Sequence, residues 1–205
     1  MIAALCVILC ITCVLITRKS IVGSIIEIIA FGFAFKTRMQ KAYTVCTEML
    51  VQRGCEIKDN EDSASIIAEK DGITIGAFFI DAPKFNVELI EKVMGALSSI
   101  NAKVGIIVHK GTVTACAKKI TAMEDADVKL EMFHVDELQF NVTKHRYVPL
   151  HEKVSDSETE QIKKKFGVKF GHMQLTDAIS RFYSFERGDL IRIHRPDGIA
   201  YRVVR

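Results

Sequence analysis

The alternation of apolar and polar positions divides the chain into three regions that predict different structures. Residues 1–38 are almost continuously apolar, whereas the sequence from Met39 onward alternates between helical and strand periodicities. Short strands and turns dominate from residue 141 to the end. We therefore predict a hydrophobic leader at 1–38, an N-terminal domain at 39–140 and a C-terminal domain at 141–205. A length of 205 residues suits two small domains of this kind.

The middle region is predicted to be a small α/β domain. Apolar residues recur at helical spacing from Tyr43 to Val51, and the apolar strands at 65–68 and 73–80 flank an Asp-Gly pair that favours a hairpin turn. An amphipathic helix at 87–100 precedes a continuous apolar strand at 104–108. A helix beginning near residue 115, a strand at 130–134 and a short helix at 135–138 complete the alternation, which indicates an α/β fold.

The C-terminal region is predicted to be a small α+β domain. Ser155 and Glu158 have the spacing of a capping box, and Gly167 suits the end of the helix that follows. Asp177 is predicted to cap a second helix. Strands at 190–195 and 199–204 flank a turn at 196–198, and the period of two gives the first of them a half-buried character with a basic face.

The leader has three interpretations that the sequence leaves open. Its first apolar run, 2–17, has 16 residues, which is short of the roughly 20 needed to cross a bilayer as a helix. Joining it to the next run would bury Arg18 and Lys19. The segment is a short membrane anchor, a signal peptide without a charged start, or an extension preceding a true start at Met39.

The chemistry-bearing residues indicate neither a metal site nor a cofactor. Cys10 and Cys13 have a CxxC spacing, but no second pair or suitable histidine follows them. His145 and His151 flank a proline in a geometry unsuited to paired ligands. We interpret the cysteines as small apolar residues of a reducing compartment. The sequon at 141–143 matters only for a secreted chain.

The last sixty residues resemble the small shared subunit of cellular RNA polymerases, which is the fifth subunit of the eukaryotic enzymes and has a counterpart in the archaeal enzyme. The resemblance is carried by the His-x-x-Val-Pro-x-His run at 145–151, by Thr-Asp-Ala-Ile at 176–179, by 187–196 and by the closing Tyr-Arg at 201–202. Two departures are an alanine at 178, where the family has proline, and a turn shortened to 196–200. The N-terminal domain resembles the family's jaw domain in the order of its elements.

The resemblance implies a non-catalytic subunit of a nuclear DNA-directed RNA polymerase that binds no small-molecule substrate. Its implied fold is an α/β jaw domain of the restriction-endonuclease type followed by a small α+β assembly domain. Its implied partners are the largest subunit and other polymerase subunits, with downstream DNA nearby and a membrane only if 1–38 is an anchor. The implied interface residues are His145, Pro149, His151, Asp177, Arg181, Arg187, Gly188, Asp189, Arg192, Arg195, Tyr201 and Arg202.

Two functions of other classes remain as alternatives. A membrane-tethered interaction protein would use 1–38 as its anchor. A metal-dependent nuclease would need Asp81 as a ligand, together with a Glu-x-Lys sequence on the next strand. The nearest run, 81–84, lacks that spacing, and Asp81 and Pro83 are typical of a turn after a buried strand.

Overall fold

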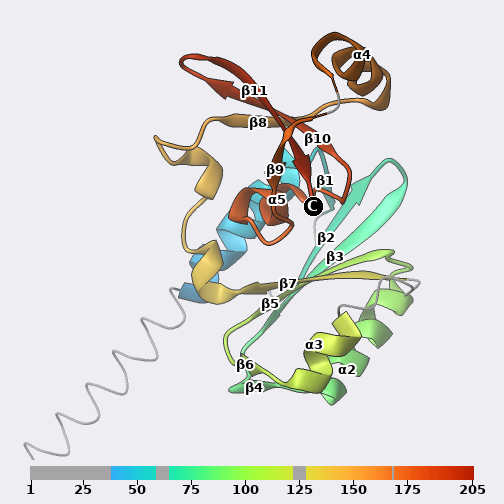
Figure 1. Ribbon diagram of the computed structural model, residues 1–205. Coiled ribbons are helices and arrows are strands. Elements are labelled where there is room, and N and C mark those ends of the chain that lie inside the picture. Colours follow the sequence, from blue (N-terminus) through green and yellow to red (C-terminus); the bar gives the residue numbers. More distant parts are fainter. Residues whose placement is uncertain (1–37, 59–64, 122–127, 168) are drawn as a thin grey trace, which may run out of the picture. The chain divides into compact units, whose positions relative to one another are not determined.

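The computed structural model describes residues 38–58, 65–121, 128–167 and 169–205, so the leader prediction lies almost wholly outside the described residues. Residues Ala42–Arg205 form one compact unit. This unit is mixed α/β, as the sequence predicted, and its described part contains a five-stranded sheet, a four-stranded sheet and a two-stranded pair (Figure 1). Within the described ranges, no helix has the length and apolar character needed to span a membrane.

The first sheet is mixed, with strand order β1-β2-β3-β5-β7. Its β1–β2 and β2–β3 pairs are antiparallel, whereas β3–β5 and β5–β7 are parallel. The parallel pairs require crossover connections, which the predicted helices supply. The strands are β1 (Glu56–Lys58), β2 (Ser65–Lys70), β3 (Ile73–Ile80), β5 (Val104–His109) and β7 (Lys129–His134).

The hairpin between β2 and β3 confirms the turn predicted from its Asp-Gly pair. Asp71 and Gly72 both have positive φ angles, 51° and 77°, and Lys70 pairs directly with Ile73. This two-residue geometry matches the twist of the flanking strands and favours glycine at the second position. The register of the antiparallel pair is therefore fixed locally by the turn.

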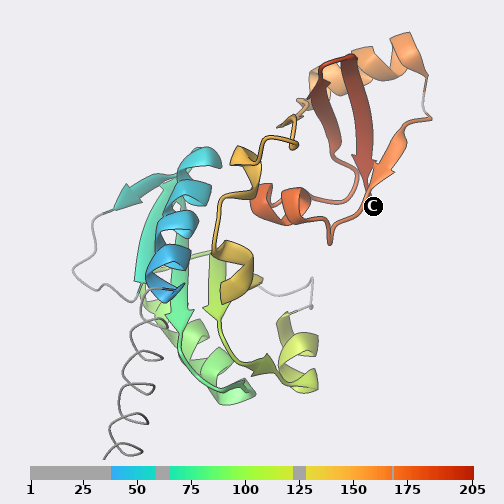
Figure 2. The ribbon, with the colours of Figure 1, turned by 90° about the vertical axis from the view of Figure 1, so that its left-hand side faces the viewer.

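Helices cover both faces of the first sheet. A helix at 38–52 places Tyr43 against Phe79 of β3, with ring centroids 5.2 Å apart. The helix α2 (Val87–Ser99) packs Ile90, Val93 and Leu97 into a core on the opposite face of the sheet (Figure 2). Neighbouring side chains of a strand point to opposite faces, so β3 contributes to both cores.

Two glycines let α2 approach the sheet closely. A Cβ built on Gly105 would lie 2.5 Å from Leu97 Cδ1, and one on Gly76 would lie 2.9 Å from Leu97 Cδ2. Gly76 and Gly105 are paired in register on β3 and β5, so they form one flat patch beneath the helix. Larger residues there would push α2 away from the sheet.

The remaining elements of the first part are short. Asn86 caps α2 by accepting a hydrogen bond from Leu89 N at 3.2 Å. His134 caps η1, accepting from Asp136 N at 3.3 Å, while its own N–H donates to Glu137 Oε1 at 3.2 Å. These elements are β4 (Lys84–Phe85), which pairs in parallel with β6 (Thr112–Val113), α3 (Ala115–Thr121), η1 (Val135–Leu138) and η2 (Val142–Lys144).

The second sheet is built wholly from the last part of the chain and has strand order β8-β10-β11-β9. The β10–β11 hairpin is antiparallel, β8 adds antiparallel to β10, and β9 adds parallel to β11. Asp177 caps α5 as predicted, accepting from Ile179 N at 2.9 Å. The elements are β8 (Leu150–Lys153), α4 (Asp156–Phe166), β9 (Gly171–Met173), α5 (Ala178–Tyr183), β10 (Leu190–Arg195) and β11 (Gly198–Val204).

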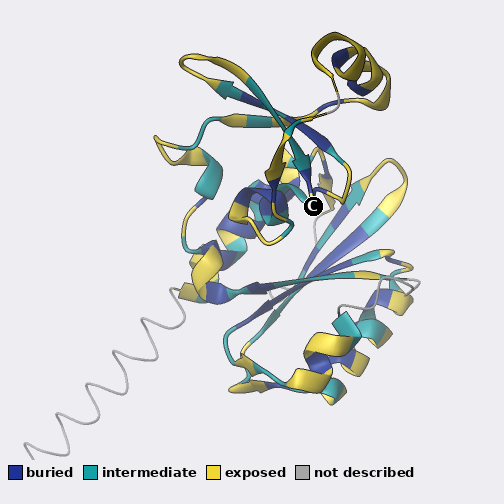
Figure 3. Cartoon of the chain, in the orientation of Figure 1, coloured by how far each residue is buried: buried dark blue, intermediate teal, exposed yellow. Residues whose placement is uncertain are grey.

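The central strand β10 is buried on the face of Ile191 and Ile193 and only partly covered on the other face, where the sequence predicted a basic surface. Ile191 and Ile193 pack into the core that contains α5, and Leu190 packs with Ile162 of α4 on the other face. Figure 3 shows buried residues concentrated in the central strands of both sheets. The period of two was interpreted as one buried and one solvated face, because nothing local indicates that α4 folds back over the strand.

Two further details differ from the predictions. The short strands β1, β4, β6 and β9 were not predicted, because two or three residues are too few to show a periodicity. Ser155 caps α4 by accepting from Glu158 N at 3.4 Å. The Glu158 carboxylate, however, points to Arg192 Nη2, also at 3.4 Å. A tertiary ion pair thus replaces the reciprocal half of the expected capping box.

The stability of the fold is expected to fall as the pH drops below about 6.5, partly through His109. Burial lowers the pKa of His109 below its usual 6.5, while a hydrogen bond from Nδ1 to Gly111 O acts in the opposite direction. A folded-state pKa below the unfolded value means that this stabilisation is present above pH 6.5. It is lost as the pH falls toward the folded pKa.

Chemical denaturation at pH 7.5 and pH 5.5 checks this prediction. His109→Asn keeps an N–H donor near Nδ1 but removes the titrating ring, so its free energy of unfolding should fall less between the two pH values than that of the native chain. Burial lowers the pKa of His151 as well, so a residual dependence is expected. Equal losses in both proteins would contradict a role for His109.

Candidate partner interface

One face of the second sheet gathers three of the predicted interface residues. His151 pairs directly with Ile193, and Arg202 pairs directly with Ile191, so both side chains lie on the face of the sheet that carries those isoleucines. Arg195 follows Ile193 by two residues and lies on the same face. Segments that are 50 residues apart in the chain thus bring three basic side chains to the margin of the face that α5 covers, with Arg195 exposed and the other two partly exposed. We call this set the arginine face: His151, Arg195 and Arg202.

The pKa of His151 reports the electrostatics of the arginine face. Burial lowers this pKa most, and the charges of Arg202 and Arg195 lower it further. The hydrogen bond from Nδ1 to Pro149 O, 2.7 Å long, and the carboxylate of Asp177 raise it. Burial and the two neighbouring arginines therefore disfavour protonation of His151, and Asp177 partly offsets their effect on its pKa.

The segment at 145–149, which precedes β8, is largely exposed, and contacts among its own residues hold part of its shape. Val148 N donates to His145 O at 2.9 Å, which closes a turn. The His145 and Tyr147 rings lie 5.6 Å apart, and Arg146 lies over the Tyr147 ring at 4.4 Å. Tyr147 is 73% exposed. This segment presents aromatic and basic side chains on the surface next to Pro149.

The turn before β10 is ordered by Asp189. Its carboxylate accepts from Glu186 N at 2.8 Å and pairs with Lys153 Nζ at 2.8 Å. Gly188 has a φ of 92°, and its N–H donates to Val204 O at 3.0 Å. The contacts of Asp189 and the positive φ of Gly188 therefore stabilise the conformation of the turn. Arg187 is exposed beside them.

Gly188→Val is expected to destabilise the fold by about 1–3 kcal/mol and to weaken partner binding with it. No atom lies within 4 Å of the position that a Cβ would take on Gly188, so the penalty comes from a β-branched residue at positive φ rather than from a clash. Thermal unfolding measures the loss. Gly188→Asn tolerates this backbone region better and should lose less. Equal stability of the valine variant would contradict the assignment.

Arg181 points into the first sheet. Its guanidinium pairs with Glu137, donates to Met132 O and lies over the Phe133 ring at 4.8 Å. Its side chain is 32% exposed. These contacts engage the Arg181 guanidinium within its own chain. Arg181 therefore joins α5 to β7 and η1.

Arg192 and Tyr201 lie on the face of the second sheet opposite the arginine face. They pair with each other in register, and Glu152 of β8 pairs with Arg192 on its other side. Arg192 Nη2 lies 3.4 Å from Glu158 Oε2, and Nη1 lies 4.0 Å from Glu152 Oε2. Two carboxylates thus balance this arginine, while the Tyr201 ring packs against residues of the α4 region.

An ionic network that the sequence analysis missed joins the first sheet to α5. Arg53 pairs with Glu131 of β7 at 2.8 Å, and the two side chains are only 6% and 13% exposed. Arg53 also donates to Phe182 O at 2.8 Å and to Arg181 O at 2.9 Å, which satisfies carbonyls at the C-terminal end of α5. The only local signal was an arginine directly before a glycine.

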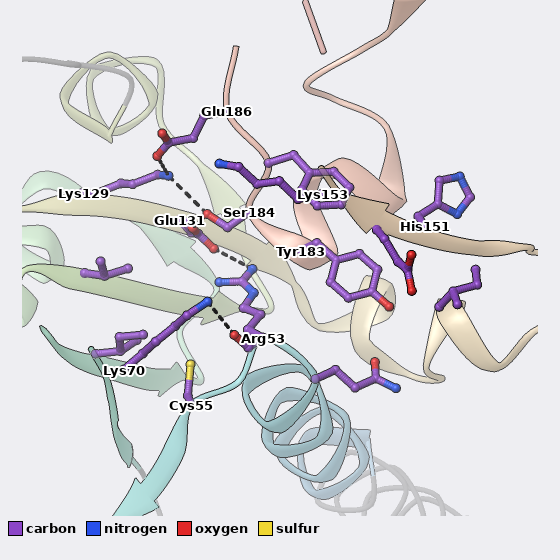
Figure 4. Close-up of a pocket in the computed structure, with 16 residues that line it drawn as sticks. Arg53, Cys55, Lys70, Lys129, Glu131, His151, Lys153, Tyr183, Ser184 and Glu186 are labelled. Atoms are coloured by element: carbon purple, nitrogen blue, oxygen red, sulfur yellow. Dashed lines mark hydrogen bonds and ion pairs between the residues drawn. The ribbon is translucent and has the colours of Figure 1, made fainter. Parts of the chain in front are cut away.

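A cavity of about 630 Å³ lies beside this network (Figure 4). Its charged side chains are already engaged within the chain. Lys70 donates to Arg53 O at 2.7 Å, and Lys129 pairs with Glu186 at 2.9 Å. Lys153 pairs with Asp189. We interpret the cavity as an intramolecular seam, because each of these cations already has a partner within the chain.

The residues behind the alternative functions have ordinary surroundings. Asn141 is 7% exposed and donates to Glu48 Oε2 at 2.8 Å, so the sequon residue is buried in the fold. Asp81 is exposed at the end of β3, 3.8 Å from Lys110 Nζ. Among the described residues, no three His, Cys, Asp or Glu side chains form a group able to hold a metal ion.

The described part of the chain is a mixed α/β fold whose last part forms a sheet of its own, and the comparisons with known proteins assign that part to a class of polymerase subunits. Residues 140–205, which include the whole second sheet, match the family model of the RNA polymerase Rpb5 C-terminal domain. The chain is also similar to a putative DNA-directed RNA polymerase subunit, 454R, of Invertebrate iridescent virus 6. The two are 30% identical over 185 residues, which cover 80% of this chain and 98% of the viral protein. The chain therefore belongs to the Rpb5 family of RNA polymerase subunits, which confirms the predicted resemblance.

Cellular relatives show the same similarity. The rpabc1 subunit of DNA-directed RNA polymerases I, II and III of Dictyostelium discoideum is 30% identical over 136 residues, which cover 64% of this chain and 69% of that protein. The polymerase V subunit 5A of Arabidopsis thaliana is 27% identical over 172 residues, covering 72% and 77%. The similarity extends well beyond the C-terminal domain into the first sheet.

Proposed function

We propose that this chain is a non-catalytic subunit of a DNA-directed RNA polymerase, shared between enzymes where several exist and acting in transcription in the nucleus. The observation that carries the proposal is the match of the second sheet and its helices to the Rpb5 C-terminal domain. Relatives named as polymerase subunits in cellular organisms and a virus support it. The work of the chain is assembly rather than bond-making chemistry.

The C-terminal domain, from 141 to 205, docks on the largest subunit of the polymerase through the arginine face. Arg195 and Arg202 have planar donor groups that suit bidentate contacts with carboxylates. His145, Tyr147 and Pro149 extend this surface along the exposed segment before β8. Of the other candidate residues, Asp177, Arg181, Gly188 and Asp189 preserve the shape of the docking domain rather than contacting the partner.

The N-terminal domain, from 39 to 140, is a jaw of the restriction-endonuclease type that lies near downstream DNA. The sheet order, with helices on both faces, supports this assignment. The side chains of Lys84 on β4 and of Lys118 and Lys119 on α3 are exposed. Such lysines form salt-dependent contacts with DNA phosphates, which position a protein without reading sequence.

Affinity purification of the full chain from cells that express it tests this proposal. The tag belongs at the C-terminus, because a peptide bond there keeps the Arg205 carbonyl that accepts from Leu175 N at 3.1 Å, and the tag stays on the chain if residues 1–38 are removed. The expected result is recovery of the two large polymerase subunits in stoichiometric amounts, with the tagged chain concentrated in the nucleus. Recovery of membrane proteins without polymerase would overturn the proposal and favour the tethered alternative.

A further inference from the structure

A second surface on the C-terminal domain has the composition of a docking groove. It lies between α4 and β11 and has a volume of about 620 Å³. Its position is on the face of the second sheet opposite the arginine face, so it is distinct from the proposed polymerase contact. The residues that the argument uses are Lys165, Phe166, Lys169, Phe170, Ile199 and Tyr201.

The floor of the groove is aromatic and incompletely covered. The Tyr201 ring lies 6.0 Å from the Phe166 ring and 6.2 Å from the Phe170 ring. Phe166 is nevertheless 58% exposed, and Ile199 at its edge is 56% exposed. Large apolar side chains that gather on a surface and remain in water mark a place where another chain binds. The site therefore has room and apolar contact area for a partner's aromatic or aliphatic side chain.

The charge around the groove is positive and is not balanced within it. Arg192 pairs with Glu158, which is the one acidic side chain among the described residues that line the groove. Lys165 Nζ lies over the Phe166 ring at 5.2 Å, and Lys169 lines the same rim. Both lysines are exposed. The surplus of two cations beside an apolar floor is complementary to a segment that carries both carboxylates and a large apolar side chain.

We propose that this groove binds a short acidic segment of a partner protein. An aromatic or aliphatic side chain of the segment packs on Phe166, Tyr201 and Ile199, and its flanking carboxylates pair with Lys165 and Lys169. Aromatic contacts supply most of the affinity, and the lysines provide orientation and discriminate against basic segments. This surface gives the chain a second contact that does not depend on its attachment to a polymerase.

Fluorescence anisotropy with the purified full chain tests the proposal. The probe is a short labelled peptide in which a Leu-Phe pair is flanked by glutamates. Saturable binding is expected, and both Phe166→Ala and the pair Lys165→Glu with Lys169→Glu should weaken it by about tenfold or more. The matched control is Lys163→Glu with Lys164→Glu, which makes the same charge change on exposed residues of α4 outside the groove and should weaken binding less than about threefold.

Three results would overturn the proposal. One is an absence of saturable binding by the native chain. Another is an equal loss of binding in the control variant, which would indicate unspecific attraction between charges. The third is that Phe166→Ala leaves peptide binding unaffected but abolishes either binding to phosphatidylserine vesicles or self-association of the chain. Loss of vesicle binding would assign the groove to a membrane, and loss of self-association would assign it to a second copy of the chain. Polymerase recovery is measured separately, so its failure and the failure of this proposal are distinguishable.

Discussion

Arg53→Ala is expected to lower the free energy of unfolding by about 3–5 kcal/mol. The substitution removes the ion pair with Glu131 and two hydrogen bonds to the end of α5. It also leaves the Glu131 carboxylate buried without its cation, and an uncompensated buried charge costs more than the pair contributes. Thermal or chemical unfolding of the variant measures the loss.

The control for this prediction is Arg187→Ala, an identical substitution at an exposed arginine, which should change stability by no more than about 0.5 kcal/mol. A double variant with Glu131→Ala should lose less than the sum of the two single losses, because it removes the orphaned carboxylate. Additive losses would contradict a direct interaction between Arg53 and Glu131. Losses of unfolding free energy that are less than additive would show that β7 and the helix that precedes Gly54 stabilise each other through this ion pair.

Arg195→Glu combined with Arg202→Glu is expected to reduce recovery of the polymerase with the chain by about tenfold or more, corresponding to about 1.4 kcal/mol or more of binding energy. Both residues lie on the arginine face, and reversal of their charges replaces attraction with repulsion toward an acidic partner. Quantitative mass spectrometry after affinity purification measures the two large subunits relative to the tagged chain.

Two comparisons make this prediction specific. Lys163→Glu with Lys164→Glu changes the net charge by the same amount on the other side of the sheet and should leave polymerase recovery unchanged. The arginine variant should also unfold at the same temperature as the native chain, because Arg195 is exposed and Arg202 partly exposed. Unchanged recovery with the arginine variant would place the polymerase contact elsewhere on the domain.

Local signals predicted the elements of this fold where those signals were strong. The Asp-Gly pair predicted the β2–β3 hairpin, and Asp177 caps a helix where a short polar side chain precedes an apolar run. The strand at 190–195 has the bounds that alternation predicted. Each signal acts over a few residues, so it needs no knowledge of the rest of the chain.

The candidate site was only partly predictable for the same reason. Arg181, Arg192 and Arg195 resemble one another in the sequence, yet Arg181 contacts the first sheet, Arg192 is balanced by two glutamates and Arg195 remains exposed. The residue pattern indicated that apolar and polar positions alternate along the strand, but not which face of the sheet α4 covers. Which face of the sheet is covered depends on where the helices before and after the strand pack, and residues far from the strand decide that packing.

Neighbouring residues were enough to indicate the family, the order of the longer elements and the turn at Gly188, because motifs, periodicity and backbone preferences are local properties. Three features depend on the packing of the whole fold: the placement of His151, Arg195 and Arg202 on one face, the burial of Arg53 against Glu131, and the aromatic groove beside α4. Each joins segments that are far apart in the chain. Their proximity follows from strand register and helix packing, which minimise exposed apolar area over the whole fold rather than within any segment.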